Sequence, residues 1–306
     1  MHCYTGRMAE HAQRFGGPWS LLKVEVVEKY LQAFNAALRL KPAPNNPFTR
    51  TYIDTFAGSG AFTFANADDV PLLAEDEAQH IHQGSVKRAL AIQPPFDEIF
   101  LIEKKRKNAN SLRAATGNDT RVTVIEGDAN IEAIALLKRL NWRHRRGVIF
   151  VDPYGPECGW DIVRTIAQTK ALDMWWLFPI SAVYRNAPRD SSALTPDKHA
   201  LVARCLDNRC WEEELYRSKP DVGQEDLFSE LHFTPQSQDR VPVSEIEAYV
   251  TERLHTLFPH VEKPAPLRLR GDGGAQLFSL YFAVSNESPA AIRAASSIAR
   301  SLLRKL

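Results

Sequence analysis

The chain alternates short apolar segments with helical segments between residues 51 and 178, and this alternation constrains its fold more than any other feature. The apolar segments are continuous, as in strands that are covered on both faces of a sheet. Strands that alternate with helices of about 10–15 residues predict a parallel sheet with helices on both sides. The five expected strands are residues 51–55, 98–103, 121–126, 147–152 and 172–178.

Helices are expected before and between these strands. Apolar residues at helical spacing predict a first helix over residues 19–40, which the proline-rich stretch at 42–47 ends. Residues 62–83 carry no clear period and are expected to form a long loop. The helices between the strands are expected at residues 85–92, 105–116, 130–141 and 161–169.

The pattern is lost after the fifth strand. Residues 186–197 are expected to form a linker and residues 198–216 a helix, and the polar stretch that follows has no predicted element. Order returns with a helix over 243–258, whose start carries a capping-box pattern from Ser244 to Glu247.

The C-terminal region closes the sheet. Two strand-like runs, 267–271 and 276–285, are joined by a glycine-rich turn and predict a hairpin. Ser288-Pro289 then opens a terminal helix, with proline in a first-turn position that it tolerates. The expected organisation is an N-terminal arm, a cofactor-binding core, a helical or irregular insert on the substrate side, and a closing segment of the core. These parts correspond to residues 1–18, 19–180, 181–240 and 241–306.

Acidic residues stand at the ends of four of the expected strands. They are Asp54, Glu103, Asp128 and Asp152, of which Asp128 comes just past its strand. In an open parallel sheet, ligands bind beyond the carboxyl ends of the strands. Four acids on one rim therefore favour a binding site over a purely structural origin.

Each residue type at this rim suits one part of a cationic, nucleoside-containing cofactor. Gly58 and Gly60 follow the first strand and let the backbone approach a ligand with no Cβ atom in the way. Asp54 is expected to meet a cationic amino group. Glu103 is expected to accept from both ribose hydroxyls, and Asp128 from the exocyclic amine of adenine.

Cofactors that carry phosphates fit the glycine loop less well. A nucleoside-triphosphate site needs Gly-x4-Gly-Lys-Ser/Thr, which the sequence does not contain. A dinucleotide site needs Gly-x-Gly-x-x-Gly, and here Thr63 stands in place of the third glycine. Glu103 also lies far beyond the spacing of about 20 residues expected of a ribose-binding acid, although the loop at 62–83 would account for that. A nicotinamide-dependent oxidoreductase therefore ranks third among the function hypotheses.

The order of elements resembles that of S-adenosylmethionine-dependent methyltransferases, in which a Rossmann-like sheet is closed by an antiparallel hairpin strand. The stretch at residues 56–60, Phe-Ala-Gly-Ser-Gly, also resembles the first motif of amino-methyltransferases that act on nucleic-acid bases, and adds Phe56 to the cofactor-binding set. Those families carry Asp/Asn-Pro-Pro-aromatic after the fourth strand, where the acid and the next carbonyl bond the target amine and the ring stacks on the flipped base. This chain has Asp152, Pro153 and Tyr154 there, with one proline fewer.

A closer resemblance covers the whole predicted core. The opening helix and the residues around Asp54, Glu103, Asp128 and Asp152 resemble the three-Cys-motif partner proteins (TcmP). Members of that family look like methyltransferases and are thought to work beside a separate radical-SAM-type protein that bears the three-cysteine motif. Their opening helix commonly carries Lys-His, of which this chain has Lys23. The resemblance implies a class I methyltransferase sheet with a helical insert after the fifth strand, S-adenosylmethionine as cofactor, and such a protein as partner.

The leading function hypothesis is methyl transfer from S-adenosylmethionine to an amine of a nucleic-acid base. Asp152 and the Pro153 carbonyl would orient the amine, and Tyr154 would form an apolar wall or stacking surface. The insert at 181–240 is expected to carry substrate specificity. The alternative is a non-catalytic protein with a methyltransferase fold that serves as partner of a radical-SAM-type protein.

The charge balance limits how nucleic acid would be bound. Lys and Arg total 38 and Asp and Glu 37, which gives a formal net charge of +1. A chain held to nucleic acid by bulk charge shows a basic excess, so any such site here must be local. Residues 104–107 are one candidate, although a solvated helical turn is the favoured interpretation.

Composition and short motifs limit the cellular compartment and the kinds of site that are expected. Four scattered cysteines and a polar N-terminus without a signal peptide favour a cytoplasmic protein with buried thiols. The longest apolar run, residues 174–180, falls far short of the about 20 residues that a membrane helix needs. His80 and His82 lie in an acidic stretch that is interpreted as a flexible loop, so no metal site is expected. Trp175 and Trp176 are expected in the core.

Overall fold

The computed structural model describes residues 13–14, 19–43, 45–63, 82–207, 211–218, 238–269 and 273–306. Within them, the main sheet has eight strands in the order β13-β15-β10-β9-β4-β7-β8, and β14 also pairs with β15. The five strands expected from the sequence are all present and pair in parallel. They are β4 (Thr49–Asp54), β7 (Glu98–Glu103), β8 (Val122–Glu126), β9 (Arg145–Val151) and β10 (Leu172–Phe178).

An antiparallel hairpin closes the sheet, as predicted. β15 (Gln276–Val284) runs antiparallel to β10, and β14 (Ala265–Arg268) pairs antiparallel with the other edge of β15. The short strand β13 (His260–Val261) continues this edge and was not predicted. The middle of the turn between β14 and β15 lies outside the described residues. A Rossmann-like, mostly parallel sheet with a closing antiparallel strand is therefore confirmed.

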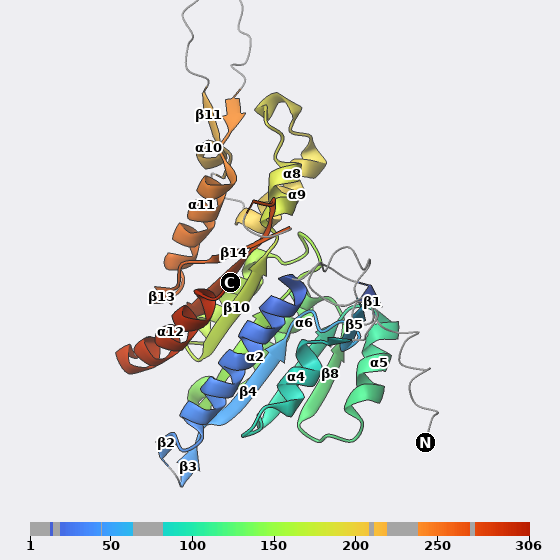
Figure 1. Ribbon diagram of the computed structural model, residues 1–306, viewed down its shortest axis with the longest axis vertical. Coiled ribbons are helices and arrows are strands. Elements are labelled where there is room, and N and C mark those ends of the chain that lie inside the picture. The colour runs from blue at the N-terminus through green and yellow to red at the C-terminus, as the bar shows by residue number, and fades with distance from the viewer. Residues whose placement is uncertain are drawn as a thin grey trace, which may run out of the picture.

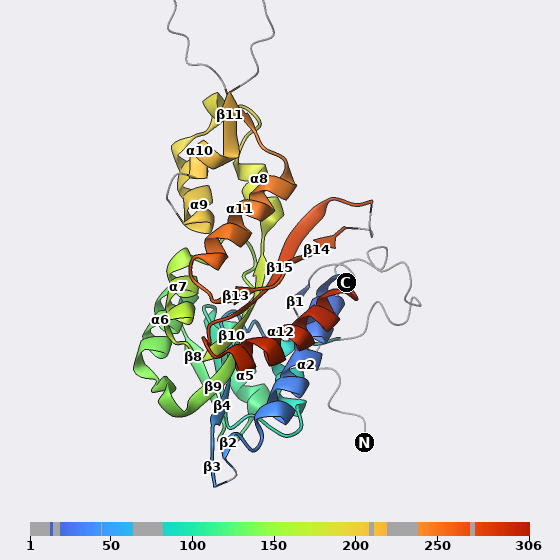
Figure 2. The same ribbon diagram turned by 90° about the vertical axis from the view of Figure 1, so that its left-hand side faces the viewer.

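Helices cover both faces of the sheet, which explains why its strands are continuously apolar (Figure 2). Tyr52 and Ile53, neighbours on β4, are both fully buried but belong to separate hydrophobic clusters. One cluster includes buried side chains from α2 (Trp19–Leu38), α4 (Ser85–Ala91), α5 (Arg106–Thr116) and α12 (Pro289–Leu303). The other includes side chains from α6 (Ala129–Arg139), α7 (Trp160–Gln168), α8 (Ile180–Asn186), α9 (Pro196–Leu206) and α11 (Val243–His255).

Large aromatic side chains fill the layer around β10. Trp175 and Trp176 point to opposite faces and are 0% and 1% exposed, so their predicted place in the core is confirmed. Tyr30 from α2 packs edge-on against Trp175, and its hydroxyl donates to the buried Asp173 carboxylate at 2.6 Å. This contact ties α2 to β10 and so fixes where the opening helix crosses the sheet.

The insert after β10 is more helical than predicted, and Figure 1 shows it extending beyond the carboxyl end of β10. Part of the expected linker at 186–197 is helical, because α8 runs to Asn186 and a 3-10 turn covers Ser191–Ala193. The single helix expected over 198–216 is wrong, since α9 ends where Asp207 adopts a left-handed conformation with φ of 76°. The rest of the insert contains α10 (Trp211–Leu215), β11 (Tyr216–Ser218) and β12 (Gln238–Arg240).

The capping box predicted at Ser244 is wrong. α11 begins at Val243 with Pro242 as its N-cap, and no side chain caps this end. The Glu247 carboxylate instead accepts hydrogen bonds from Gln276 and Ser279 of β15, at 2.6 and 2.5 Å. Proline favours the extended backbone that the residue before a helix adopts. The Glu247 carboxylate cannot cap the helix because it is already bonded to β15. The predicted start of α12 at Ser288-Pro289 is confirmed.

Short strands complete the described elements. β1 (Gln13–Arg14), β5 (Ala61–Thr63) and β6 (His82–Gln83) form a small sheet, and β2 (Pro42–Ala43) pairs with β3 (Asn46–Pro47). A 3-10 turn, Trp142–His144, precedes β9. None of the helices in the described ranges combines the length and the apolarity needed to cross a bilayer.

Candidate functional site

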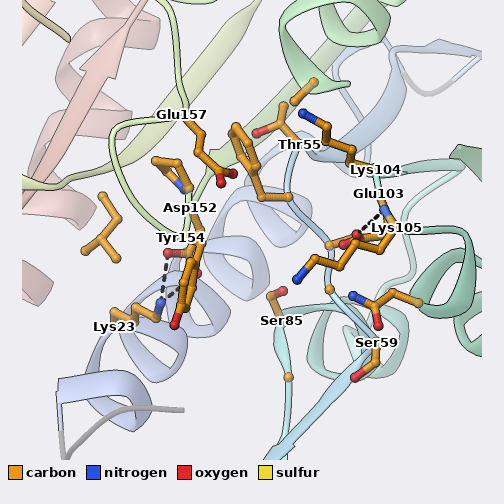
Figure 3. A pocket seen from close by; sticks show the side chains of 18 of the residues that line it. Lys23, Thr55, Ser59, Ser85, Glu103, Lys104, Lys105, Asp152, Tyr154 and Glu157 are labelled. Carbon is orange, nitrogen blue, oxygen red and sulfur yellow. Dashed lines mark hydrogen bonds and ion pairs between the residues drawn. The ribbon is translucent and has the colours of Figure 1, made fainter. Parts of the chain in front are cut away.

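One large pocket, of about 840 Å³, lies at the carboxyl ends of the parallel strands (Figure 3). The loops that follow β4, β7, β8 and β9 line it, together with residues from α2, α8, α9 and the start of β15. The chain lays down β4, β7 and β8 toward one edge of the sheet and then places β9 and β10 on the other side of β4. A ligand site in an open α/β sheet is expected at this point of reversal.

The glycine loop after β4 forms one wall of the pocket. Gly58 and Gly60 have φ values of 63° and 81°, a left-handed conformation that glycine adopts without strain. A Cβ atom on Gly60 would also approach Leu112 Cδ2 to 3.2 Å. The Ala57 amide donates to the Ile102 carbonyl at 3.0 Å and so ties the loop to β7. Phe56, Gly58 and Gly60 thus line the pocket together, as the sequence predicted.

Asp54 stands behind this wall and is not among the residues that line the pocket. Its carboxylate is 1% exposed and accepts from the Ser85 hydroxyl at 2.6 Å, with longer bonds from the Phe56 amide and the Tyr52 hydroxyl. Burial raises the pKa of Asp54 to about 6, and the Ser85 bond opposes that rise. The carboxylate therefore holds the glycine loop and α4 together. Its expected contact with a cofactor amino group stays a prediction.

Glu103 lies on the other side of the glycine loop, at the end of β7, and lines the pocket. Its side chain is largely buried and its Oε1 accepts from the Lys105 amide at 2.7 Å. Asn108, one turn into α5, also lines the pocket and is 8% exposed. The Asn108 Nδ2 donor is buried and has no hydrogen-bond partner among the described residues. A buried donor without a partner is costly, so this pair presents an acceptor and a donor that suit a bound polar ligand.

Asp128 reaches the same pocket from the start of α6, where it is the N-cap. Oδ1 accepts from the Asn130 amide at 2.9 Å, and Oδ2 accepts from Lys104 Nζ at 2.8 Å. The Lys104 bond and the cap bond lower the pKa of Asp128 to about 2. The carboxylate is therefore ionised at neutral pH, and its expected bond to an adenine amine would have to share these oxygens with Lys104 and Asn130.

Asp152, Pro153 and Tyr154 line the pocket just after β9. Figure 3 shows the Lys23 side chain reaching from α2 to Asp152, on the side of the pocket opposite Glu103 and Lys105. Lys23 Nζ donates to both Asp152 oxygens, at 2.6 and 2.8 Å, and the two side chains are only 12% and 20% exposed. Tyr154 is 73% exposed beside this ion pair.

Asn130 fixes the loop that carries these three residues. Its Nδ2 donates to the Glu157 carbonyl at 2.8 Å, and its Oδ1 accepts from the Gly159 amide at 2.7 Å. The loop after β9 is therefore bonded to the start of α6. Because Asn130 also donates to Asp128, the rim residues on β8 and β9 are positioned as one unit.

Several lining residues were not identified as site residues from the sequence. They are Ser59, Ser85, Asn108, Asn130, Leu177, Ser181, Arg185, Arg204, Leu277 and Phe278. Lys23 was suggested only by the family resemblance. No cluster of three or more His, Cys, Asp or Glu side chains suited to a metal occurs in the described part of the chain, and His80 lies outside it. Cys158 and Cys205 are buried free thiols, as expected, whereas Cys3 and Cys210 are outside the described residues.

Comparison with known proteins places the fold but not the substrate. No family model matches the chain, and no curated protein matches it in sequence. Protein LPL1258 from Legionella pneumophila, of the family DUF519, superposes with a TM-score of 0.50 at 13% identity, over 94% of this chain and 93% of that one. The glycopeptide N-methyltransferase MtfA, solved with S-adenosyl-L-homocysteine, superposes with a TM-score of 0.31 at 13% identity, over 91% and 94%. At these identities the likeness to the Legionella protein is one of fold.

Proposed function

We propose that this protein is an S-adenosylmethionine-dependent methyltransferase that methylates an amine of a nucleic-acid base. The observation that carries the proposal is the pairing of an acceptor and an unpartnered donor, Glu103 and Asn108, beside the left-handed glycine loop. These groups meet in a pocket at the strand reversal of a mostly parallel sheet.

The residues of this half of the pocket fit a nucleoside-containing cofactor. Glu103 would accept from the ribose hydroxyls, and Asn108 Nδ2 would gain the acceptor that it lacks within the described chain. The backbone at Gly58 and Gly60 would approach the amino-acid part without a Cβ atom between them. When bound, S-adenosylmethionine supplies a sulfonium methyl group that is already activated for transfer.

The protein's task is then to place the acceptor amine. Asp152 lies across the pocket from Glu103 and, together with the Pro153 carbonyl, would orient an amine toward the cofactor side. The exposed Tyr154 ring offers a surface on which a base can stack. Lys23 holds both oxygens of Asp152 from α2, so the carboxylate is fixed before an acceptor arrives.

The same ion pair supports a second candidate function. A lysine ammonium already occupies the carboxylate that an acceptor amine would need. This arrangement favours a protein that binds S-adenosylmethionine or a partner without transferring a methyl group, such as the partner of a radical-SAM-type protein that the TcmP resemblance implies. The two candidates share the cofactor half of the pocket and differ at Asp152.

Calorimetry with S-adenosylmethionine tests the shared part. Glu103→Gln is expected to weaken binding by about 10- to 30-fold, because it removes a charged hydrogen-bond acceptor. Glu126→Gln is the matched control, because Glu126 is the register partner of Glu103 on β8 but does not line the pocket. Equal affinity in the wild type and Glu103→Gln would contradict the cofactor assignment.

A single-turnover assay with methyl-labelled S-adenosylmethionine separates the two candidates. The methyltransferase proposal expects transfer to tRNA, rRNA or DNA in a stoichiometric burst. Cofactor binding without transfer to any of these, also when a radical-SAM-type protein with the three-cysteine motif is added, would favour the non-catalytic partner.

A further inference from the structure

The pocket continues past Asp152 into a second half that the cofactor does not require. Its walls include residues of β10, α8, α9 and the start of β15. In the sheet, β10 and β15 lie on the far side of β9 from β7, the strand that carries Glu103. Leu177, Leu277 and Phe278 give this half apolar walls, and Ser181 adds a hydroxyl. Because Asp152 stands between the two halves, the second half is on the acceptor side.

Two arginines also line this half. Arg185 is on α8 and Arg204 is on α9, and both are exposed. Neither forms an ion pair or a hydrogen bond with any of the described residues. Arg164 and Arg253, in the same region, both pair with the buried Asp207. The arginines of this region therefore divide into two that hold the fold and two that present free guanidinium groups to the pocket.

Other arginines, which are paired inside the protein, hold the two helices that carry Arg185 and Arg204 in place. Asp207 ends α9, three residues after Arg204, and binds Arg164 of α7 and Arg253 of α11. Arg240 donates to two carbonyls at the end of α8, those of Tyr184 and Ala187, and lies over the Tyr184 ring. The backbones of α8 and α9 are therefore anchored within one helical turn of Arg185 and of Arg204. These contacts fix the positions of the two arginines relative to each other.

Other charges at this pocket mouth form a mixed set. Lys104 is paired with Asp128, and the exposed Glu157 also lies near Lys104. The positive charge of Arg204 acts on Lys104 and opposes the rise in pKa that Asp128 causes there, so the two cations lie on neighbouring parts of the rim. Lys104 already has a carboxylate partner, whereas Arg185 and Arg204 have none among the described residues and can bind an anion from outside the chain.

We infer that Arg185 and Arg204 form a phosphodiester-binding site for the nucleic-acid strand that carries the target base. A guanidinium group binds a phosphate through two parallel hydrogen bonds, and its charge is not lost at any physiological pH. Apolar walls beside the two arginines suit a base or ribose attached to that phosphate. The inference rests on the proposed function and locates the substrate strand over α8 and α9. It also explains how a chain with a net charge of +1 would bind nucleic acid, through a local pair of charges.

The test measures the affinity of fluorescein-labelled single-stranded RNA and DNA oligonucleotides by anisotropy as potassium chloride is raised. Each phosphate contact to a single strand contributes about 0.7 to the slope of log affinity against log salt. The double variant Arg185→Gln/Arg204→Gln is expected to lower that slope by about 1.4 and to weaken binding by about tenfold or more. Arg189→Gln is the matched control, because Arg189 is an exposed arginine of the same insert that does not line the pocket.

Calorimetry with S-adenosylmethionine keeps this inference separate from the proposed function. The double variant is expected to bind the cofactor as the wild type does, since neither arginine is among the groups assigned to the cofactor, which are Glu103, Asn108 and the glycine loop. An unchanged salt slope, an equal loss in Arg189→Gln, or a wild type that binds the cofactor but no oligonucleotide would overturn the inference and leave the cofactor site standing. A polyglutamate of equal charge that binds as well as RNA, and loses as much in the double variant, would overturn the phosphodiester assignment.

Discussion

The two halves of the pocket are built in different ways. On the cofactor half, carboxylates are used inside the protein: Asp54 holds Ser85 and the glycine loop, and Asp128 caps α6 and binds Lys104. At the boundary between the halves, Asp152 is held by a lysine from a distant helix, and on the acceptor half Arg185 and Arg204 have no carboxylate partner among the described residues. The contacts on the cofactor half join residues 31 and 24 positions apart, whereas Lys23 and Asp152 are 129 positions apart.

From this difference we expect the first half of the pocket to bind the cofactor and the second half to select the substrate. A rim made of strand ends and the helices that follow them is available to any chain with this sheet, so it suits a common cofactor. The acceptor half depends on α2 and on the insert, which lie outside the run of alternating strands and helices that builds the rim. Changes in the first half should therefore affect cofactor affinity and stability, and changes in the second should affect turnover and substrate.

The largest effect is expected at Asp152, where the two halves meet. In the proposed reaction, Asp152 orients the acceptor amine and stabilises the positive charge that develops on it, and Asp152→Ala removes this group. We expect the rate constant of methyl transfer to fall roughly 100- to 1,000-fold, while the dissociation constant of S-adenosylmethionine stays within about threefold. Single-turnover kinetics and calorimetry on the same samples measure the two quantities.

Glu157→Gln is the control for this variant, since Glu157 is an exposed acid on the same loop of the pocket. It should change the rate constant little. A variant lacking the Asp152 carboxylate that still transfers the methyl group at the wild-type rate would remove Asp152 from the mechanism, and with it the boundary between the two halves.

A smaller effect, on stability and not on turnover, is expected at Asp54. Its folded pKa of about 6 is higher than the value of about 3.9 expected in the unfolded chain. The folded state therefore binds the proton more tightly, and the stability contributed by protonation is full below about pH 4 and lost as the pH rises to about 6. Two pKa units correspond to about 3 kcal/mol of unfolding free energy.

Urea unfolding from about pH 4 to about pH 7 measures this contribution. Asp54→Asn cannot titrate, so the stability of the wild type relative to this variant is expected to fall by about 3 kcal/mol over that range. Both proteins keep Asp173, whose pKa is raised to about 7 by burial, and both should lose its contribution with the same sign. Parallel stability curves for the two proteins would show that Asp54 is already ionised when folded.

The sequence predicted the cofactor half more fully than the acceptor half, for a physical reason. Parallel strands place their carboxyl ends on one rim, so an acid after a continuous apolar run can be assigned to that rim without a structure. Glu103, Asp128 and Asp152 were found in this way, as was the glycine loop. Asp54 has the same signature but is covered by Ser85 and Tyr52, and nothing in the spacing shows which strand-end acid will be covered.

The other site residues were not predicted, mainly because their positions depend on contacts between residues far apart in the sequence. Lys23 and Asp152 are 129 residues apart, and their contact depends on where α2 crosses the sheet. Arg185 stands near the end of α8, for which the sequence predicted no element, and Arg204 lies on a helix whose end is set by the backbone of Asp207. Asn108 lies on α5 without a pattern to distinguish it from other polar residues, and only its buried, unpartnered amide marks it.

The smallest effect is expected at Lys23. Its size and sign show whether the Lys23–Asp152 ion pair helps or hinders methyl transfer. If Lys23 positions Asp152, Lys23→Met should lower the rate constant of methyl transfer by about tenfold, less than the loss of Asp152 itself. Breaking a mostly buried pair should also lower the unfolding free energy by about 1–2 kcal/mol. Lys29→Met is the matched control, because Lys29 is an exposed lysine on the same helix, paired with Glu25.

A double-mutant cycle distinguishes positioning from a general loss of structure. In the Asp152→Ala background, Lys23→Met should have little further effect on the rate constant, because Lys23 then has no carboxylate to orient. A faster reaction in Lys23→Met would show that the lysine competes with the acceptor amine for Asp152. Equal effects of Lys23→Met with and without Asp152 would show that the two side chains act independently. The distinction between the two halves of the pocket would then rest on Arg185 and Arg204 alone.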